Sequence, residues 1–138
     1  MSNLYVRDLM SEKVHTIEPS EDLEKLYELM EDYHIRHVPV VNANGELEGI
    51  VSNRDLVKNA LFADGELPLS QRQNFLESIT VESIMTKDPE VIEPDQKIQD
   101  AGNIMLENKI SCLPVTENDK VVGIITEADF VKFVLSEY

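Results

Sequence analysis

Apolar residues along the first sixty positions follow the spacing of a helix in one stretch and the spacing of a strand in others. Leu23, Leu26, Tyr27 and Met30 stand three and four positions apart, which predicts an amphipathic helix with these residues on its buried stripe. Ser20 is expected to cap this helix, because a hydroxyl oxygen can accept from the unpaired amides of a first turn.

Short apolar runs flank this helix. Thr16–Ile17 precedes a proline and reads as a short extended segment. Residues 38–41 read as a buried strand, residues 42–45 as a hairpin turn, and residues 47–51 as the returning strand. Pro39 has no N–H, so its strand belongs at a sheet edge or beside a gap in the ladder. Ser52 is expected to open a second helix.

The same order of elements recurs later in the chain, with Val81 in the place of Val6, an offset of 75 residues. After the hairpin turn the offset falls to 74, as Gly123 matches Gly49. Asp95 is the expected helix cap of the second copy. We therefore expect a first repeat over residues 1–60, a helical connector over residues 61–80 and a second repeat over residues 81–138.

The connector and the last helix carry their own signals. Ser70 with Gln73 has capping-box spacing and predicts a short helix whose apolar contacts are Phe75, Leu76 and Ile79. The final helix has an apolar stripe at Phe130, Val131, Val134 and Leu135, and Phe133 lies off that stripe. A helix that is apolar nearly all round is usually buried, here by the two halves or by a second subunit.

The charge and composition exclude several classes of protein. The 138 residues carry a net charge of −15, which argues against a partner that is nucleic acid or an anionic membrane surface. No apolar run approaches the length of a membrane span. The first residues lack the features of a signal peptide, so the cytoplasm is expected. The acidic composition is explained either by a need for solubility or by adaptation to a saline cytoplasm. The single cysteine, Cys112, is expected to be a buried core residue.

Two nearly identical heptads, "GIVSNRD" at 49–55 and "GIITEAD" at 123–129, each place an aspartate three positions after a hydroxyl residue. Ser52 with Asp55, and Thr126 with Asp129, have the spacing of a capping box with a shorter acid. A helix N-terminus also favours anions. Capping and ligand binding are compatible roles for these residues.

These heptads, with "HVPVV" and "CLPVT" ahead of each hairpin, resemble the tandem CBS domain pair, or Bateman module. The stretches "KISCLPV" and "GIITEADF" are most similar to stand-alone CBS proteins of the acetoin-utilisation type. The resemblance implies an α/β (α+β) fold of two β-α-β-β-α units with pseudo-two-fold symmetry and small sheets flanked by helices. It implies a regulatory, non-catalytic module that senses adenine nucleotides or adenosyl ligands in the cleft between the units, and a flat homodimer. The alternative is a dimeric scaffold with unoccupied sites.

The resemblance also implies which residues contact such a ligand. Ribose hydroxyls suit the paired oxygens of Ser52 and Asp55 and of Thr126 and Asp129. The adenine would lie against Thr16, Ile17, Val38 and Pro39 in one site and against Val91, Ile92, Leu113 and Pro114 in the other. Arg36, His37 and Arg54 would hold phosphates, whereas the matching second-repeat residues are Ser111, Cys112 and Ala128. We therefore expect the better phosphate site in the first repeat, or else solvated arginines that offset local acids.

The ligand candidates are AMP, ADP, ATP, NAD(H) and S-adenosylmethionine. A phosphate near so acidic a chain needs local arginines or, for a di- or triphosphate, Mg²⁺. A positively charged S-adenosylmethionine meets no repulsion.

No cofactor is required, and no metal site is expected at His34 and His37. The sequence has no glycine-rich phosphate loop or activated nucleophile, so no catalysis is expected. The chain ends at Tyr138 without an effector domain, so the regulated target is expected to be another protein.

Overall fold

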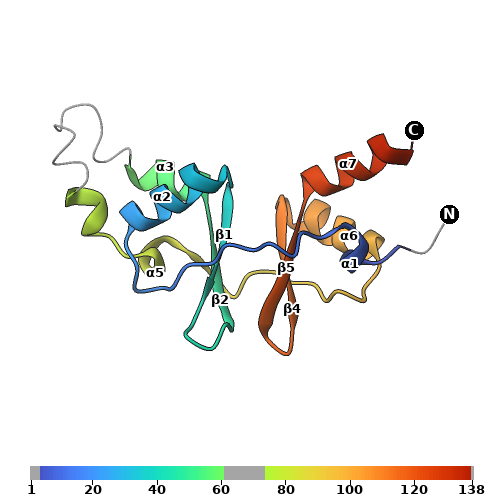
Figure 1. Ribbon diagram of the computed structural model, residues 1–138, viewed down its shortest axis with the longest axis horizontal. Coiled ribbons are helices and arrows are strands. Elements are labelled where there is room, and N and C mark those ends of the chain that lie inside the picture. Colours follow the sequence, from blue (N-terminus) through green and yellow to red (C-terminus); the bar gives the residue numbers. More distant parts are fainter. Residues whose placement is uncertain (1–3, 61–73, 138) are drawn as a thin grey trace. The chain divides into compact units, whose positions relative to one another are not determined.

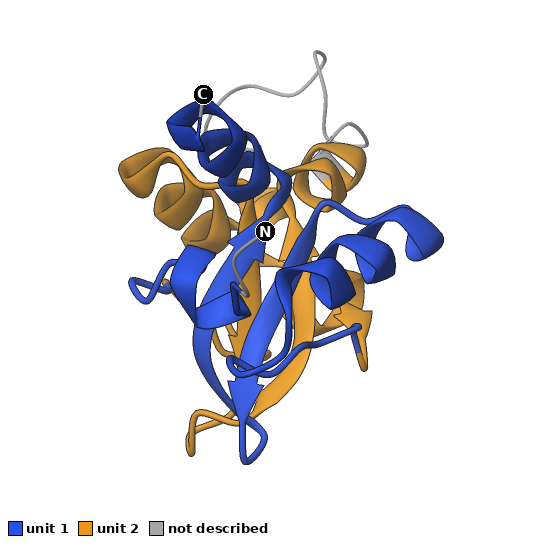
Figure 2. Ribbon diagram, turned by 90° about the vertical axis from the view of Figure 1, so that its right-hand side faces the viewer, with its two compact units in different colours: residues 1–14, 89–138 blue, residues 15–88 orange. Residues whose placement is uncertain are grey.

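A computed structural model describes residues 4–60 and 74–137 of the chain. The chain forms two compact units, shown in separate colours in Figure 2. Unit 1 contains residues 1–14 and 89–138, and unit 2 contains residues 15–88. The chain passes from one unit to the other twice, after Val14 and after Asp88.

Unit 2 contains a three-stranded antiparallel sheet in the order β1-β2-β3, with helices packed against it (Figure 1). Its elements are α2 (Leu23–Tyr33), β1 (His37–Val41), β2 (Leu47–Ser52), α3 (Asn53–Ala60), α5 (Val81–Ile84) and β3 (Thr86–Lys87). The expected hairpin is present: Asn42 Oδ1 accepts from the amides of Asn44 and Glu46 at 2.9 and 3.0 Å. Gly45 takes the left-handed conformation, with φ of 82°, which a glycine adopts without strain.

The core of unit 2 is built from one face of α2 and alternate positions of the strands. Leu23, Leu26 and Met30 of α2 are buried against Val38 and Val40 of β1. Strand side chains alternate between faces, so His37 and Pro39 lie on the opposite face of β1. The helical spacing is confirmed at three of its four positions, but Tyr27 is 46% exposed and lies outside the buried stripe.

Unit 1 repeats this design with a two-stranded sheet. Its elements are α1 (Val6–Leu9), α6 (Ile98–Asn108), β4 (Cys112–Glu117), β5 (Lys120–Thr126) and α7 (Glu127–Glu137). The hairpin between β4 and β5 is tighter than that of unit 2, with Asn118 and Asp119 at positive φ. Two residues with positive φ are typical of a short hairpin turn, which explains the shorter offset between the repeats.

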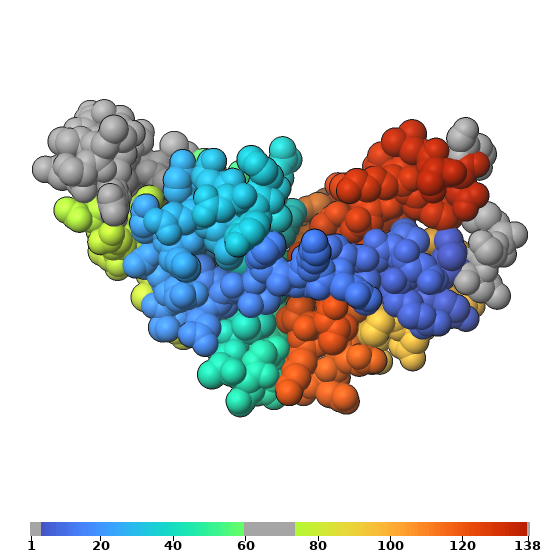
Figure 3. All heavy atoms as spheres, viewed as in Figure 1, coloured from blue at the N-terminus to red at the C-terminus, as the bar shows by residue number. Residues whose placement is uncertain are grey.

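The N-terminal segment completes unit 1. Val6 is fully buried in the core that includes Leu113 and Val115. The Ser11 amide donates to the Ile124 carbonyl of β5 at 2.9 Å, and the Ile124 amide donates back at 3.0 Å. Figure 3 shows the N-terminal segment lying directly against α7. Residues early in the chain thus pack on elements more than a hundred positions later.

A matching segment completes unit 2. Val81 is fully buried in the unit 2 core, and β3 pairs with β2 through Gly49 and Ile50. The opening segment of each sequence repeat therefore packs on the strands of the other repeat. The expected division at residues 1–60, 61–80 and 81–138 follows the sequence repeats and stays a prediction, whereas the compact units are residues 15–88 and residues 1–14 with 89–138.

The helix caps differ from those expected. Asp22, not Ser20, caps α2, because its Oδ1 accepts from the Lys25 amide at 2.9 Å. Lys97 precedes α6 without a side-chain cap, and Asp95 lies in the turn before it. The helices begin at Leu23 and Ile98, three positions after Ser20 and Asp95, so these two residues lie two positions before the N-cap, too far from the first-turn amides.

Part of the connector is described. Residues 74–77 are helical, and Leu76 and Ile79 pack against the unit 2 core. Phe75 is half-buried, whereas the proposed capping pair Ser70 and Gln73 lies outside the described residues. Within residues 4–60 and 74–137, no helix is long and apolar enough to cross a bilayer.

Candidate functional site

In unit 2, a capping box joins the end of β2 to the start of α3. The Asp55 amide donates to Ser52 Oγ at 3.2 Å, and Asp55 Oδ2 accepts from the Ser52 amide at 2.9 Å. The Ser52 hydroxyl also donates to Asp55 Oδ2 at 2.9 Å. The capping role expected from the sequence is therefore present, with aspartate in the place of the usual glutamate.

In unit 1, the matching pair forms a looser version of this arrangement. Asp129 Oδ2 accepts from the Thr126 amide at 2.8 Å and from Thr126 Oγ1 at 3.3 Å. Both carboxylates are half-buried where a strand meets a helix.

These contacts use only one oxygen of each carboxylate. Among residues 4–60 and 74–137, neither Asp55 Oδ1 nor Asp129 Oδ1 makes a hydrogen bond. An ionised carboxylate has about four lone-pair positions, so each aspartate can still accept from ligand hydroxyls. The capping bonds hold that carboxylate in a fixed orientation.

The segment before α2 pairs with β1 of unit 2. Ile17 pairs with Val40 of β1 in parallel, because the Ile17 amide donates to the Pro39 carbonyl at 3.1 Å and the Val41 amide donates to Ile17 at 2.9 Å. Pro39 has no N–H to continue this ladder toward Thr16, so pairing stops there. The proline beside a gap in the ladder is confirmed.

Thr16 and Ile17 have opposite surroundings. Ile17 is 2% exposed, whereas Thr16 is exposed. The ring of His15, which precedes Thr16, stacks on Tyr33 of α2 with centroids 3.8 Å apart. This stacking anchors the segment and leaves the Thr16 side chain outside the core.

The basic residues of the first repeat gather around the same capping box. The Arg36 carbonyl accepts from the Asn53 amide at 2.7 Å, His37 is the β1 partner of Ser52, and Arg54 lies on the first turn of α3. Both arginines are exposed. Within the described part of the chain, neither guanidinium has an ion pair. We call this group, with Ser52, Asn53 and Asp55 and with Thr16 as the residue predicted from the sequence, the Asp55 site.

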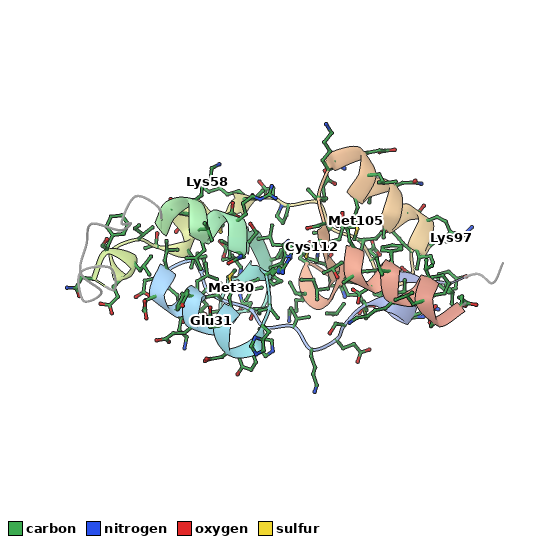
Figure 4. The ribbon with its side chains drawn as sticks, turned by 90° about the horizontal axis from the view of Figure 1, so that it is seen from above. Met30, Glu31, Lys58, Lys97, Met105 and Cys112 are labelled. Carbon is green, nitrogen blue, oxygen red and sulfur yellow. The ribbon has the colours of Figure 1, made fainter. Side chains whose placement is uncertain are left out.

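Unit 1 holds the matched group, which we call the Asp129 site: Val91, Ser111, Cys112, Thr126, Glu127, Ala128 and Asp129. The Ser111 carbonyl accepts from the Glu127 amide at 3.0 Å, and Cys112 is the β4 partner of Thr126. Burial, followed by the charge of Asp129, raises the pKa of the Cys112 thiol to about 12. The thiol is therefore protonated at neutral pH. Figure 4 labels Cys112 within unit 1.

Most of the apolar residues expected around adenine have structural roles. Ile17, Val38, Ile92 and Leu113 are at most 2% exposed and belong to the two cores. Pro39 and Pro114 are also buried, whereas Val91 is 38% exposed. Of these apolar residues, only Val91 offers accessible side-chain surface.

Sequence reasoning missed one difference between the sites. Asn53 follows Ser52 in unit 2, whereas the matching residue after Thr126 is Glu127. The offset of 74 that aligned the aspartates also aligns these two residues, so the signal was present in the sequence. Across the described ranges, no three His, Cys, Asp or Glu side chains are grouped to hold a metal.

The fold and the sites together define a class of protein: a tandem repeat in which each compact unit presents one capped carboxylate at a strand–helix junction. Comparison with known proteins gives the family. The CBS domain family matches residues 6–61 and 81–136, and the chain belongs to that family.

Two solved structures illustrate the likeness. A protein from Vibrio cholerae described as an acetoin utilization protein (AcuB) is 32% identical, with a TM-score of 0.80 over 99% of this chain and 93% of that one. CBSX2, a CBS-pair protein of Arabidopsis thaliana, was solved in complex with AMP. It is 27% identical, with a TM-score of 0.81 over 96% of this chain and 97% of that one.

Relatives also occur as parts of longer proteins. The homoserine O-acetyltransferase of Methanosarcina acetivorans is 31% identical over 91% of this chain, which covers 21% of that enzyme. The chain thus spans only about a fifth of this relative. The acetyltransferase name belongs to the whole enzyme.

Proposed function

We propose that this protein is a regulatory module that binds adenine nucleotides or adenosyl ligands and has no catalytic activity of its own. The observation that carries the proposal is the duplicated aspartate whose Oδ2 is held by a helix cap and whose Oδ1 is unbonded within the described residues. An acceptor fixed in this way suits the vicinal hydroxyls of a ribose. The AMP complex of CBSX2 supports this ligand class.

The Asp55 site is the proposed site for a phosphorylated ligand. Arg36 and Arg54 have no ion pair within the described residues, so their charges are not neutralised by neighbouring acids. Arginine suits phosphate because its planar donors can form paired hydrogen bonds. For ADP or ATP, Mg²⁺ can neutralise the additional phosphates. NAD(H) contains the same adenosine and phosphate groups.

The ligand is expected to act as a switch. A ligand shifts an equilibrium between arrangements only to the extent that its affinity for them differs. A ligand bound more tightly in one arrangement of the chain than in another would provide this difference, and the output would be read by another protein.

The test is isothermal titration calorimetry with AMP and with adenosine, on wild-type protein and on Asp55→Asn. Asparagine keeps the size of the side chain and an acceptor oxygen but loses the charge, so we expect AMP affinity at that site to fall about tenfold or more. Arg54→Ala should weaken AMP and leave adenosine unchanged. Absence of binding by adenine nucleotides, adenosine and S-adenosylmethionine to the folded wild-type protein would overturn the proposal.

A second candidate function is a dimeric scaffold, and the surface of α7 favours it. Val131, Val134 and Leu135 are 57%, 52% and 71% exposed. Three exposed apolar residues on one short helix form the kind of patch that marks an interaction surface. We propose that a second copy of the chain covers this patch.

This dimer can be tested independently of the ligand. Val134→Glu should shift the molar mass measured by light scattering from that of two chains to that of one. Val57→Glu, at a similarly exposed position on α3 (47% exposed), is the matched control and should leave the mass unchanged. A wild-type protein that stays monomeric at high concentration would contradict the dimer. A dimer that binds no adenine compound would support the scaffold.

A further inference from the structure

The two sites share one backbone scaffold. In unit 2, the Arg36 carbonyl, just before β1, accepts from the Asn53 amide, just after Ser52, at 2.7 Å. In unit 1, the Ser111 carbonyl, just before β4, accepts from the Glu127 amide, just after Thr126, at 3.0 Å. In each, the next strand residue lies opposite that hydroxyl residue. Differences in ligand preference must therefore come from the side chains.

The charges at the two sites are opposite. The Asp55 site has two arginines and one aspartate, a formal charge of +1. At the same positions the Asp129 site has Ser111 and Ala128 for the arginines and Glu127 for Asn53, which leaves two acids and a formal charge of −2. Burial and the charge of Asp129 keep the Cys112 thiol protonated, so Cys112 adds no charge.

The charged residues that differ between the sites lie beside the capping aspartate: Arg54 directly precedes Asp55, and Glu127 lies two positions before Asp129. A ribose held by the aspartate would bring its 5′ substituent toward these residues, and charges interact most strongly within about 8–10 Å, the distance beyond which salt screens them. At the Asp129 site, a 5′-phosphate would meet two carboxylates and no cation from the residues described there. A sulfonium or ammonium group would be attracted by the same carboxylates.

We propose that the Asp129 site selects an adenosyl ligand with positive or no charge on its 5′ substituent and discriminates against 5′-phosphates, while the Asp55 site takes the phosphorylated nucleotide. This inference rests on the proposed function and goes beyond it. It makes the module a sensor of two ligand classes, one for each unit.

The experiment isolates each site in the full chain. Asp55→Asn leaves the Asp129 site, and Asp129→Asn leaves the Asp55 site. Each variant is titrated with AMP, S-adenosylmethionine and S-adenosylhomocysteine, which lacks the sulfonium charge. In Asp55→Asn we expect S-adenosylmethionine to bind about tenfold or more tighter than AMP. In Asp129→Asn we expect the reverse order.

Variants that change the charge of the Asp129 site distinguish ligand selection by electrostatics from ligand selection by the shape of the site. In the Asp55→Asn background, Glu127→Gln should bring the affinities of S-adenosylmethionine and S-adenosylhomocysteine closer together. Ala128→Arg should strengthen AMP and weaken S-adenosylmethionine. Circular dichroism confirms that each variant is folded.

The outcomes separate the two proposals. If AMP binds the Asp129 site as tightly as S-adenosylmethionine, or if that site binds neither, the charge selection is wrong while AMP binding at the Asp55 site still supports the proposed function. If neither site of the wild-type protein binds any adenosine compound, both proposals fail.

Discussion

At the scale of single residues, Cys112 has the clearest electrostatic signature. Its side chain is 6% exposed, and burial together with Asp129 raises the pKa of the thiol from 9.0 to about 12. The folded state therefore holds the proton more tightly than the unfolded chain. The stabilisation is complete below the unfolded pKa near 9 and is lost as the pH rises toward 12.

We expect the free energy of unfolding of wild-type protein to fall by about 1.4 kcal/mol for each pH unit in this window, relative to Cys112→Ala. Lysines and tyrosines titrate there as well, so the difference between the two proteins is the quantity to measure, by urea unfolding at pH 8, 9 and 10. Parallel pH dependences in the two proteins would show that the thiol has an ordinary pKa.

Some residue roles could be predicted from the sequence and others could not. Asp55 and Asp129 were found because the same spacing occurs twice, and a capping interaction depends only on residues three positions apart. The caps at Ser20 and Asp95 were wrong because the N-cap directly precedes the first helical residue, and both residues lie two positions before it. Asp22, the actual cap of α2, is as good a capping residue as Ser20, so propensity alone could not choose between them.

At the scale of elements, two glycines allow a segment to cross a strand at close range. A Cβ at Gly49 would lie 2.7 Å from both Met85 Sδ and the Thr86 carbonyl oxygen. A Cβ at Gly123 would lie 2.6 Å from Met10 Sδ and 3.1 Å from the Ser11 carbonyl oxygen. A methionine side chain can move aside, but a carbonyl in a paired strand cannot do so easily.

Gly49→Ala should therefore destabilise the protein by about 1–3 kcal/mol, and Gly123→Ala should cost less because its backbone contact is longer. Gly102→Ala is the control, since its Cβ would meet only the Phe130 ring at 3.8 Å. That change should raise stability by about 0.5–1 kcal/mol through helix propensity. Thermal and urea unfolding measure all three. Equal losses at positions 49 and 102 would contradict the close-approach argument.

The order of elements within each repeat was predictable, but the short crossing segments were not. The helix at 23–33 and the hairpin after it follow from apolar spacing and a turn. By contrast, α1 and α5 have four residues each, too few to show a helical period. Their apolar residues, Val6 and Val81, are buried by strands far away in sequence, and local pattern carries no information about such contacts.

At the scale of the whole molecule, the exchange of opening segments links the two repeats. The N-terminal segment completes the core that contains β4 and β5, and the segment at 81–87 completes the core that contains β1 and β2. Each repeat therefore needs a part of the other to bury its strands. The sequence repeat reveals that there are two similar halves, but it cannot show that these segments are exchanged, because exchanged and unexchanged arrangements have the same sequence pattern.

The exchange of opening segments predicts which strands lose stability when a core residue is substituted. Val6 and Val81 occupy matching positions and both are 0% exposed, so Val6→Ala and Val81→Ala should each cost about 1–3 kcal/mol. In hydrogen exchange, Val6→Ala should reduce protection chiefly in β4 and β5, and Val81→Ala chiefly in β1 and β2. Each variant is the control for the other, because the substitution and the burial are the same. If Val6→Ala instead loosened β1 and β2, the N-terminal segment would pack on its own repeat, and the division into residues 15–88 and residues 1–14 with 89–138 would be wrong.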